Sequence, residues 1–379
     1  MPLIFISAAE PSGDRHGASL IRAVRAACPT AQFVGVAGPR MVSAGCESIF
    51  DMTRHAAMLL GALRSVGKAC KMMTACGNYL NNHAVDAAVV IDSPILHLPL
   101  AARAQSAGVP LLYYIAPQIW AWGSYRIHKL RNRCDRVAVI LPFEEKYFRD
   151  QGVEATYVGH PLAEQLTDQL IDEHAVRDMR NDGSPFISLL PGSRKHVVQS
   201  ILPGQLEVAQ QISRALPRAA FGVSVANPQV ASVIRELVGH PSVKVTEYRG
   251  KHAELIRASD LVLVASGTST LEVALHNRPM IVMYNGSRLF YHLIARWMIG
   301  TPHLALPNIL AGRVIVPEFM PYYTSTKPIA TKAIELLTSE EKRQAIVQDL
   351  RQVTAPLRNT RASARTATML LNMISHNGH

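Results

Sequence analysis

The chain has 379 residues, 48% of them hydrophobic and 18% charged, which excludes a disordered chain and supplies enough apolar side chains for two domain cores. Its formal net charge of +11 favours anionic partners, but nucleic acid, an anionic membrane and phosphorylated substrates all fit that charge. The five cysteines include no CxxC pair, which argues against a disulfide framework or a zinc site and favours a reducing compartment. The N-terminus lacks a signal-peptide pattern and no apolar run is long enough to cross a bilayer, so we expect a cytoplasmic protein, soluble or peripheral.

The first half of the chain alternates short apolar runs with helical segments. Leu3–Ser7 is the first predicted strand, and a loop follows at Ala8–Asp14. Because Pro11 limits where the next helix can begin, Ser12 is placed as its N-cap. The loop lacks the G-x-G-x-x-G pattern of an NAD site. The βαβ rhythm predicts a parallel sheet, with further strands at 33–37, 87–91, 111–115, 137–141 and 155–158.

Two basic segments each have two interpretations. Residues 58–73 are predicted to be helical, with Arg64, Lys68 and Lys71 in one basic stripe. This helix could lie on an anionic membrane, or it could be a core helix with a solvated charged face. Residues 288–298 are predicted to form a second basic helix, rich in aromatic residues, that could face a membrane or pack between domains.

Asp92 directly follows the predicted strand at 87–91. A carboxylate at the carboxyl end of a parallel strand lies where open α/β sheets bind ligands, so Asp92 is a candidate catalytic group. Asp shortly before Pro94 is also a common helix start, in which Asp92 would be an N-cap. Trp120, in the loop after the strand at 111–115, could wall a sugar or acyl site or simply cover that loop.

The polar, acidic stretch 163–183 is the predicted domain boundary. Beyond it the α/β rhythm repeats, which predicts two Rossmann-like parallel-sheet domains facing each other across a cleft, at 1–165 and 184–345, and a helical tail at 346–379. The strands of the second domain are predicted at 186–190, 220–225, 243–247, 261–265 and 279–284.

The turn at Pro191–Lys195 is typical of an anion-binding loop. It follows a buried strand and precedes a helix predicted at Val197–Leu216. Small residues such as Gly192 and Ser193 let backbone amides approach a phosphate, and the helix N-terminus adds partial positive charge. Arg194 adds a permanently charged guanidinium, although an ordinary turn with a surface arginine would have the same pattern.

A second loop of this kind, Ser266-Gly267-Thr268, follows the predicted strand at 261–265. Its amides and hydroxyls could hold a diphosphate. Glu272, one turn into the next helix, could accept hydrogen bonds from a ribose diol. Each loop alone could be a simple capping turn, but two such loops in one domain favour a nucleotide site.

Short motifs in a fixed order cover nearly the whole chain, and together they resemble the lipid-A-disaccharide synthases, a family of inverting glycosyltransferases of GT-B fold. Each motif is short, and it is their shared order that makes the resemblance specific. The motifs are Ala8–Asp14, Gly35–Met41, Ile91–Pro94, Pro117–Trp122, Leu141–Glu144, Gly159–Pro161, Leu190–Arg194, Ser266–Thr268 and Leu306–Arg313.

The resemblance implies an enzyme that joins UDP-2,3-diacylglucosamine to 2,3-diacylglucosamine 1-phosphate, giving lipid A disaccharide 1-phosphate and UDP. It implies a peripheral protein on the cytoplasmic face of the inner membrane. Residues 1–165 would be the acceptor and membrane side, 184–345 the UDP-sugar side, and 346–379 would pack back across the domains or onto a partner subunit of a homodimer. The expected partners are the two acylated glucosamine substrates and an anionic membrane, not nucleic acid. No cofactor is expected, and the lack of an Asp-x-Asp pair predicts that no metal ion is used.

The same resemblance assigns residues. Asp92 would be the general base that takes the proton of the acceptor hydroxyl, and Arg194 would stabilise the leaving diphosphate as one displacement inverts the anomeric carbon. The implied UDP-binding set is Gly192, Ser193, Ser266, Gly267, Thr268, Glu272, Asn308 and Arg313, and the acceptor-side loop set is Glu10, Ser12, Gly13, Asp14 and Trp120.

The chain departs from the family pattern mainly on the acceptor side. Ile95–His97 stands where the family usually has an acidic residue, an aromatic residue and Asn, Ala9 replaces a usual Gly, and Arg64 stands where many members carry Glu. Two alternatives stay open. One is another UDP-sugar enzyme of the same fold, such as a UDP-N-acetylglucosamine 2-epimerase or another lipid-linked glycosyltransferase. The other is an inactive, membrane-associated homologue that binds UDP-sugar.

Overall fold

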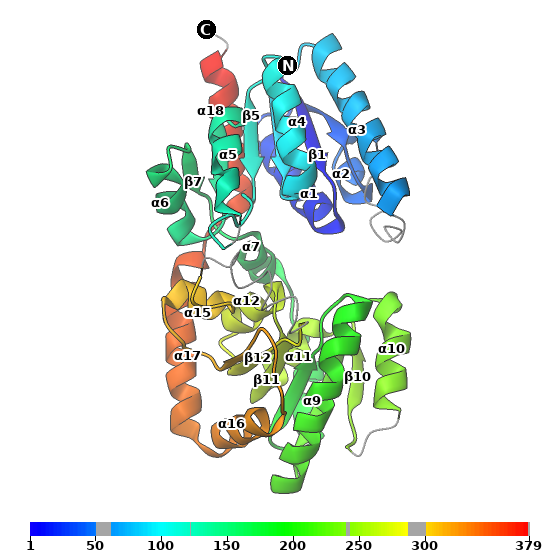
Figure 1. Cartoon of the computed structure of the whole chain (residues 1–379), viewed down its shortest axis with the longest axis vertical. Coiled ribbons are helices and arrows are strands. Elements are labelled where there is room, and N and C mark those ends of the chain that lie inside the picture. The colour runs from blue at the N-terminus through cyan, green and yellow to red at the C-terminus, as the bar shows by residue number, and fades with distance from the viewer. Residues whose placement is uncertain (51–61, 122, 240–242, 287–300, 378–379) are drawn as a thin grey trace. The chain divides into compact units, whose positions relative to one another are not determined.

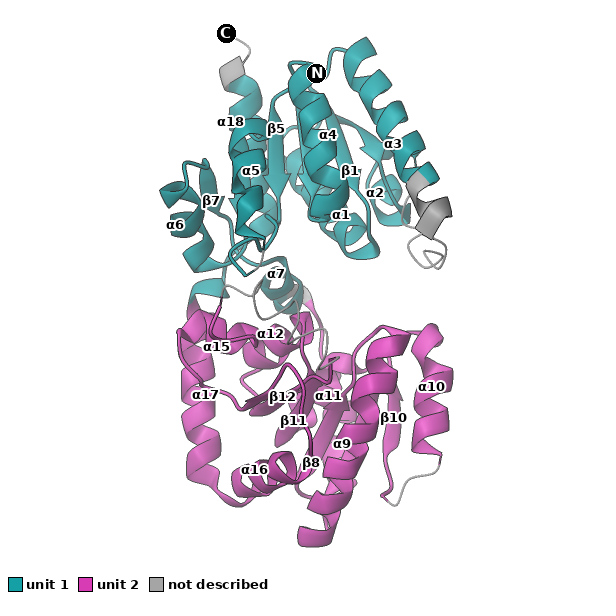
Figure 2. Ribbon diagram, in the orientation of Figure 1, with its two compact units in different colours: residues 1–167, 356–379 teal, residues 168–355 magenta. Residues whose placement is uncertain are grey.

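The computed structural model describes the chain except for residues 51–61, 122, 240–242, 287–300 and 378–379 (Figure 1). The chain forms two compact units, residues 1–167 with 356–379, and residues 168–355 (Figure 2). The sequence placed the tail from residue 346, whereas the structure assigns 346–355 to the second unit, because helix α17 (Glu340–Thr354) packs against helices of that unit. No helix in the described ranges combines the length and apolarity needed to cross a membrane.

The first unit contains a parallel sheet of seven described strands in the order β3-β2-β1-β4-β5-β6-β7. Its strands are β1 (Leu3–Ala8), β2 (Gln32–Val36), β3 (Cys46–Phe50), β4 (Ala87–Ile91), β5 (Leu111–Tyr114), β6 (Arg136–Val139) and β7 (Ala155–Tyr157). Its helices are α1 (Pro11–Ala27), α2 (Pro39–Ser43), α3 (Ala62–Asn82), α4 (Pro94–Ser106), η2 (Ser124–Arg126), α5 (Ile127–Arg133), α6 (Pro142–Asp150), α7 (Pro161–Asp168), η4 (Ala355–Leu357) and α18 (Ala362–Asn377).

Helices cover both faces of this sheet, which explains why central strands such as β4 are apolar and buried along their whole length. On one face α4 packs between α3 and α5, whereas α18 packs against α1 and β4 (Figure 1). The Glu164 carboxylate of α7 fixes the start of α18, because it accepts hydrogen bonds from the Ser363 hydroxyl and from the Ser363 amide, the latter at 3.0 Å. The last helix of the chain therefore completes the first unit.

The second unit contains a parallel sheet of six described strands in the order β10-β9-β8-β11-β12-β13. Its strands are β8 (Phe186–Leu190), β9 (Ala220–Val225), β10 (Thr246–Arg249), β11 (Leu261–Ala265), β12 (Met280–Met283) and β13 (Glu318–Phe319). Its helices are α8 (Glu173–Asn181), α9 (Lys195–Ala215), α10 (Pro228–Val238), α11 (His252–Ala258), α12 (Thr268–Leu275), α15 (Leu306–Ala311), α16 (Lys327–Thr338) and α17 (Glu340–Thr354). The prediction of two Rossmann-like parallel-sheet domains is confirmed.

Edge strands are where the sequence prediction was wrong. The strand predicted at 243–247 begins later, as β10 at Thr246, and the polar β3 and the two-residue β13 were not predicted. An edge strand pairs on one side only and faces solvent, so it need not be apolar. Val243 is nevertheless buried, since it packs into the core from the segment before β10, and this misplaced the predicted strand.

Helix starts also shifted by a few residues. Helix α1 begins at Pro11 with Glu10 in the N-cap position, so the prediction that Ser12 is the N-cap was wrong. Proline fits the first turn of a helix because its missing N–H is not needed there. Helix α12 begins at Thr268, directly after Gly267.

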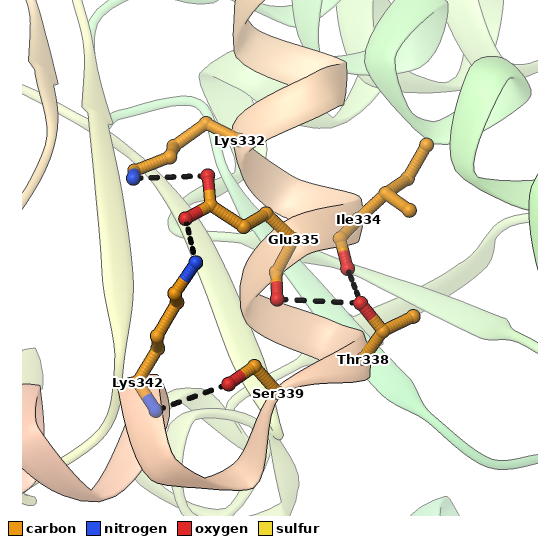
Figure 3. Close-up of polar contacts among 6 residues, drawn as sticks. All are labelled: Lys332, Ile334, Glu335, Thr338, Ser339 and Lys342. Carbon is orange, nitrogen blue, oxygen red and sulfur yellow. Dashed lines mark hydrogen bonds and ion pairs between the residues drawn. The ribbon is translucent and has the colours of Figure 1, made fainter.

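The junction of α16 and α17 is an exposed polar contact (Figure 3). Glu335 accepts from Lys332 at 3.0 Å and from Lys342 at 2.5 Å, and the Ser339 hydroxyl caps α17 by accepting from the Lys342 amide at 3.3 Å. Exposed ion pairs of this kind contribute little stability, so we regard the junction as a solvated helix turn.

Candidate functional site

In the first unit, β1 and β4 are neighbouring strands. From β1 the chain continues to β2 on one side of the pair, and from β4 it continues to β5 on the other side. Ala8 pairs with Ile91, so the loop after β1 and the residue after β4 lie at the same sheet edge. Ligands of open α/β sheets bind at such a switch point, at the carboxyl ends of the strands. Glu10 and Asp92, both proposed from sequence, flank this point.

Asp92 lies on a strained turn. Its φ is 53° and that of Ser93 is 46°, so two consecutive residues other than glycine are left-handed, at a cost of about 1–2 kcal/mol each. The N-cap of α4 is Ser93, without a side-chain cap bond, so the alternative in which Asp92 caps the helix is wrong. The turn must therefore be held by its surroundings.

Two buried side chains hold the Asp92 carbonyl. The Tyr113 hydroxyl donates to Asp92 O at 2.7 Å, and His97 Nδ1 lies 2.6 Å from the same oxygen. The Asp92 amide donates to Tyr114 O at 3.1 Å, which fixes the other end of the residue. These contacts orient the Asp92 side chain by fixing its backbone. We call Tyr113, His97 and the Asp92 carbonyl the Asp92 clamp.

His97 is held in one tautomer. Burial lowers its pKa to about 4, so the ring is neutral near pH 7. Since a carbonyl only accepts, Nδ1 carries the proton and donates to Asp92 O, and Nε2, 3.0 Å from Ser7 Oγ, accepts from that hydroxyl. The sequence had marked position 97 only as a departure from the family's Asn. A donor side chain after Asp-x-Pro was the signal that could have found this role.

The Asp92 carboxyl has an environment suited to proton transfer. Its side chain is partly buried, and burial raises its pKa above the usual 3.8, opposed by a hydrogen bond to the backbone at Ser93. A raised pKa makes the carboxylate a stronger base.

The loop after β1 separates into exposed and structural residues. Glu10 and Ser12 are exposed at the start of α1, whereas Gly13 is buried, and a Cβ there would lie 3.3 Å from Ala8 Cβ. Asp14 is 4% exposed, and its two carboxylate oxygens accept from the amides of Arg40 and Met41, at 3.1 and 3.0 Å. Asp14 therefore binds the start of α2, which explains why the first two motifs occur together.

Trp120 is a buried structural residue. It is 9% exposed, and its Nε1 donates to Glu144 Oε1 at 2.9 Å, while Glu144 Oε2 accepts from the amides of Ile140 and Leu141. Its ring meets Phe143 edge to face at a centroid distance of 4.9 Å. Burial raises the pKa of Glu144 to about 7. The indole thus fixes the loop after β5 to α6.

In the second unit, the corresponding switch point lies between β8 and β11. Gly192 follows β8 with φ of 105°, and a Cβ there would lie 3.1 Å from Val197 and 3.9 Å from Ala265 at the end of β11. Glycine is therefore required by both conformation and space. The two loops proposed from sequence are neighbours at this edge.

The loop after β8 is held by a residue that sequence analysis missed. Asn227 Nδ2 donates to Ser193 O at 2.8 Å, while Asn227 Oδ1 accepts from the Val230 amide as the N-cap of α10. An Asn-Pro pair after the strand at 220–225 was the available signal. Arg194 is exposed in the N-cap position of α9, so its guanidinium can reach a ligand at the helix start.

The loop after β11 has open space around its glycine. Gly267, with φ of 145°, is the N-cap of α12, and no atom of the described residues beyond its adjacent backbone lies within 4 Å of a Cβ built there. Gly267 O accepts from the Thr270 hydroxyl at 2.8 Å, and the exposed Thr268 begins the helix. The N-termini of α9 and α12 therefore supply partial positive charge at one sheet edge, which suits an anion.

Glu272 lies in the second turn of α12. Its Oε2 is 3.3 Å from His252 Nε2, and His252 Nδ1 is 2.8 Å from Ser224 Oγ. Sequence analysis missed both partners, which come from β9 and α11 and lie far from Glu272 along the chain.

Asn308 and Arg313 are engaged within the second unit. The buried Asn308 amide donates to Val316 O and Glu318, and its oxygen accepts from two amides, those of Ile315 and Val316. Arg313 is exposed and pairs with Asp349 at 2.6 Å. Asn308 is therefore tied into the turn between α15 and β13, and α15 itself packs against α12.

The fold defines a class of protein. The chain is similar to a UDP complex of MnaA from S. aureus, with a TM-score of 0.67 and 14% identity, covering 99% of this chain and 98% of that one. It is also similar to MurG from Acinetobacter baumannii, with a TM-score of 0.60, 14% identity and coverage of 98% and 100%. These likenesses show the two-domain GT-B fold.

The sequence defines the family within that class. The lipid-A-disaccharide synthetase family model matches residues 4–372. A lipid-A-disaccharide synthase of Trichlorobacter lovleyi is 35% identical over 373 residues, which are 98% of this chain and 97% of the relative. One of Nitrosococcus oceani is 35% identical over 356 residues, 92% and 90% of the two chains. The chain belongs to the lipid-A-disaccharide synthase family.

Proposed function

We propose that this protein is an inverting glycosyltransferase that joins UDP-2,3-diacylglucosamine to 2,3-diacylglucosamine 1-phosphate, giving lipid A disaccharide 1-phosphate and UDP. The observation that carries the proposal is the family match over residues 4–372, together with relatives at 35% identity. UDP-N-acetylglucosamine 2-epimerases share the fold, as one from Neisseria meningitidis does with a TM-score of 0.60, but at 11% identity that likeness concerns the fold alone.

In this proposal Asp92 is the general base. Its carboxylate takes the proton of the acceptor hydroxyl as the oxygen attacks the anomeric carbon and the bond to the diphosphate breaks. The strained turn, the Asp92 clamp and the raised pKa of the carboxyl support this role. General base catalysis of this kind contributes roughly 10²–10⁴ in rate.

The second unit would hold the leaving UDP. Arg194 and the amides of the loops at Gly192-Ser193 and Ser266-Gly267-Thr268 would stabilise the charge that develops on the diphosphate. The exposed arginine, the open space at Gly267 and the N-termini of α9 and α12 support this role. Losing one such donor costs on the order of 10²–10³ in rate. Glu272 would accept hydrogen bonds from the ribose.

The residues of the acceptor-side set and the UDP-binding set divide into those that would contact a ligand and those that would hold a loop in place. We propose that Glu10 and Ser12, which are exposed, contact the acceptor side, whereas Gly13, Asp14 and Trp120 shape the loops that carry it. On the nucleotide side, Asn308 would support the turn beside α12, and Arg313 would contribute only after leaving its ion pair with Asp349.

We further propose peripheral binding to the inner face of the inner membrane, as a homodimer. The net charge of +11 supports attraction to anionic lipid, at about 1 kcal/mol for each cationic residue near the surface. The segments proposed for membrane contact, 58–73 and 288–298, lie partly and wholly outside the described residues. Flotation with anionic vesicles at low and high salt tests the binding, and the absence of salt-sensitive flotation would contradict it.

The function is tested by incubating the protein with UDP-diacylglucosamine, with and without diacylglucosamine 1-phosphate. UDP release that requires the acceptor is the expected result. Conversion of the donor without acceptor would instead indicate an epimerase. Binding of UDP without any turnover would indicate an inactive homologue, and either result would overturn the proposal.

A further inference from the structure

Three side chains from three elements form a chain of polar contacts at the carboxyl edge of the second sheet. His252, the first residue of α11, lies between Ser224 near the end of β9 and Glu272 in α12. Its Nδ1 is 2.8 Å from Ser224 Oγ, and its Nε2 is 3.3 Å from Glu272 Oε2. The α12 helix is the one that begins at the Ser266-Gly267-Thr268 loop.

The chemistry of the groups favours one direction for this chain of contacts. A carboxylate oxygen only accepts, so a proton on His252 Nε2 would favour the 3.3 Å contact with Glu272 Oε2. On the other side of the ring, Nδ1 lies 2.8 Å from the Ser224 hydroxyl, which holds the ring in place. Ser224 is only 5% exposed, so it serves as an anchor in the core. The side chains of His252 and Glu272 are 33% and 17% exposed, so both are partly open to solvent and the carboxylate is the more buried of the two.

The position of Glu272 suits the sugar of a nucleotide. It follows Thr268 by four residues, about 6 Å along a helix axis, and helical side chains lean toward the N-terminus. A carboxylate there can reach a ribose attached to a diphosphate at the helix start. A long Glu side chain has many rotamers, and a ligand that must fix them loses binding free energy. A fixed polar contact with His252 removes part of that cost before the ligand arrives.

We propose that His252 is a positioning residue that orients the Glu272 carboxylate for the ribose hydroxyls of UDP, so that the site discriminates ribose from 2′-deoxyribose. The inference rests on the ribose-binding role of Glu272 in the proposed function. It assigns the discrimination between ribose and 2′-deoxyribose to Glu272, which would contact the ligand, and to His252, which would not.

The experiment is calorimetric titration of the full chain with UDP and with 2′-deoxy-UDP. The variants are His252→Ala, which removes the donor, His252→Gln, whose amide can replace Nε2–H, and Glu272→Gln. His174→Ala is the matched control, because His174 is an exposed histidine of the same unit whose ring contacts Arg177 instead. Thermal unfolding of each variant checks that it is folded.

For the native chain and the His174 control we expect a preference for UDP of about tenfold or more, the usual effect of a hydrogen bond to a charged group. His252→Ala should reduce the preference to about twofold by weakening UDP alone, and His252→Gln should restore most of it. Glu272→Gln should reduce the preference as strongly, and adding His252→Ala to it should change nothing further.

The results distinguish a failure of the positioning role of His252 from a failure of the ribose-binding role of Glu272. If Glu272→Gln removes the preference but His252→Ala leaves it near the native value, Glu272 binds ribose and the role of His252 is overturned. If His252→Ala weakens UDP and 2′-deoxy-UDP equally, its role is general stability and the inference is again overturned. If Glu272→Gln keeps the full preference, the ribose-binding role of Glu272 itself is wrong.

Discussion

Replacing Tyr113 by Phe removes one hydroxyl group from the Asp92 clamp and leaves the aromatic ring in place. Tyr113 is fully buried and donates to Asp92 O at 2.7 Å, so the variant keeps the packing and loses one hydrogen bond. A neutral hydrogen bond contributes about 0.5–1.5 kcal/mol, which is similar to the cost of one left-handed residue in the turn at Asp92 and Ser93. His97 would then be the one side chain of the clamp that still holds the Asp92 carbonyl.

We therefore expect a modest loss of stability and a larger loss of turnover. A misplacement of about 1 Å at a reacting group can cost about 10²-fold in rate, so a partly relaxed turn should lower kcat by roughly 10-fold to 100-fold. KM and the affinity for UDP should change little, because the hydroxyl bonds to the Asp92 carbonyl within the first unit, whereas UDP is proposed to bind the second. The assay is steady-state UDP release with defined acceptor, beside calorimetry with UDP and thermal unfolding.

Tyr114→Phe is the matched control. Tyr114 is the next residue, equally buried, and its hydroxyl bonds to Thr366, not to Asp92 O. Both variants should lose similar stability, and Tyr113→Phe alone should lose turnover. Native kcat in Tyr113→Phe, or an equal loss in both variants, would refute the argument that the clamp positions the base.

Three further substitutions test the site and the electrostatics. Asp92→Asn should bind UDP normally and lose turnover by roughly 10²–10⁴, whereas unchanged turnover would remove Asp92 from the mechanism. Arg194→Ala should weaken UDP binding measured by calorimetry and slow turnover by roughly 10²–10³, and native affinity would show that the arginine does not hold the diphosphate. In Glu144→Gln the pH dependence of stability should change. The folded pKa of Glu144 is raised to about 7 from 4.5, so its contribution is fully present below pH 4.5 and is lost as pH rises through 7. The unfolding free energy of the native chain relative to Glu144→Gln should thus fall by up to about 3 kcal/mol between pH 4.5 and 8, and a pH-independent difference in urea titrations would contradict the raised pKa.

The sequence was most informative where burial alone decides structure. The runs at 87–91, 186–190, 220–225 and 261–265 were predicted with their observed bounds, because central parallel strands are covered on both faces and must be apolar. The glycine turns at Gly192 and Gly267 were also predicted, since few residues other than glycine tolerate their φ angles. The edge strands β3, β10 and β13 were missed or misplaced because one of their sides faces solvent.

The roles of individual polar residues required the tertiary structure. Asp14 was read as a site residue, yet both of its oxygens bind amides at the start of α2, which is distant in sequence. Asp92 was identified by its place after a strand, but its strained turn and the two donors to its carbonyl were invisible, since Tyr113 comes from the neighbouring strand β5.

The sequence by itself determined the two parallel sheets, their family and the loops that we propose as ligand sites, because strand burial, turn geometry and motif order are local properties of the chain. Only the tertiary structure decided which polar groups in those loops are already bound to other parts of the protein. Hydrogen-bond partners such as Ser224 and His252, or Asn227 and Ser193, meet because the sheet order brings separate loops to one edge. That order depends on strand pairing over long chain separations, which no local pattern records.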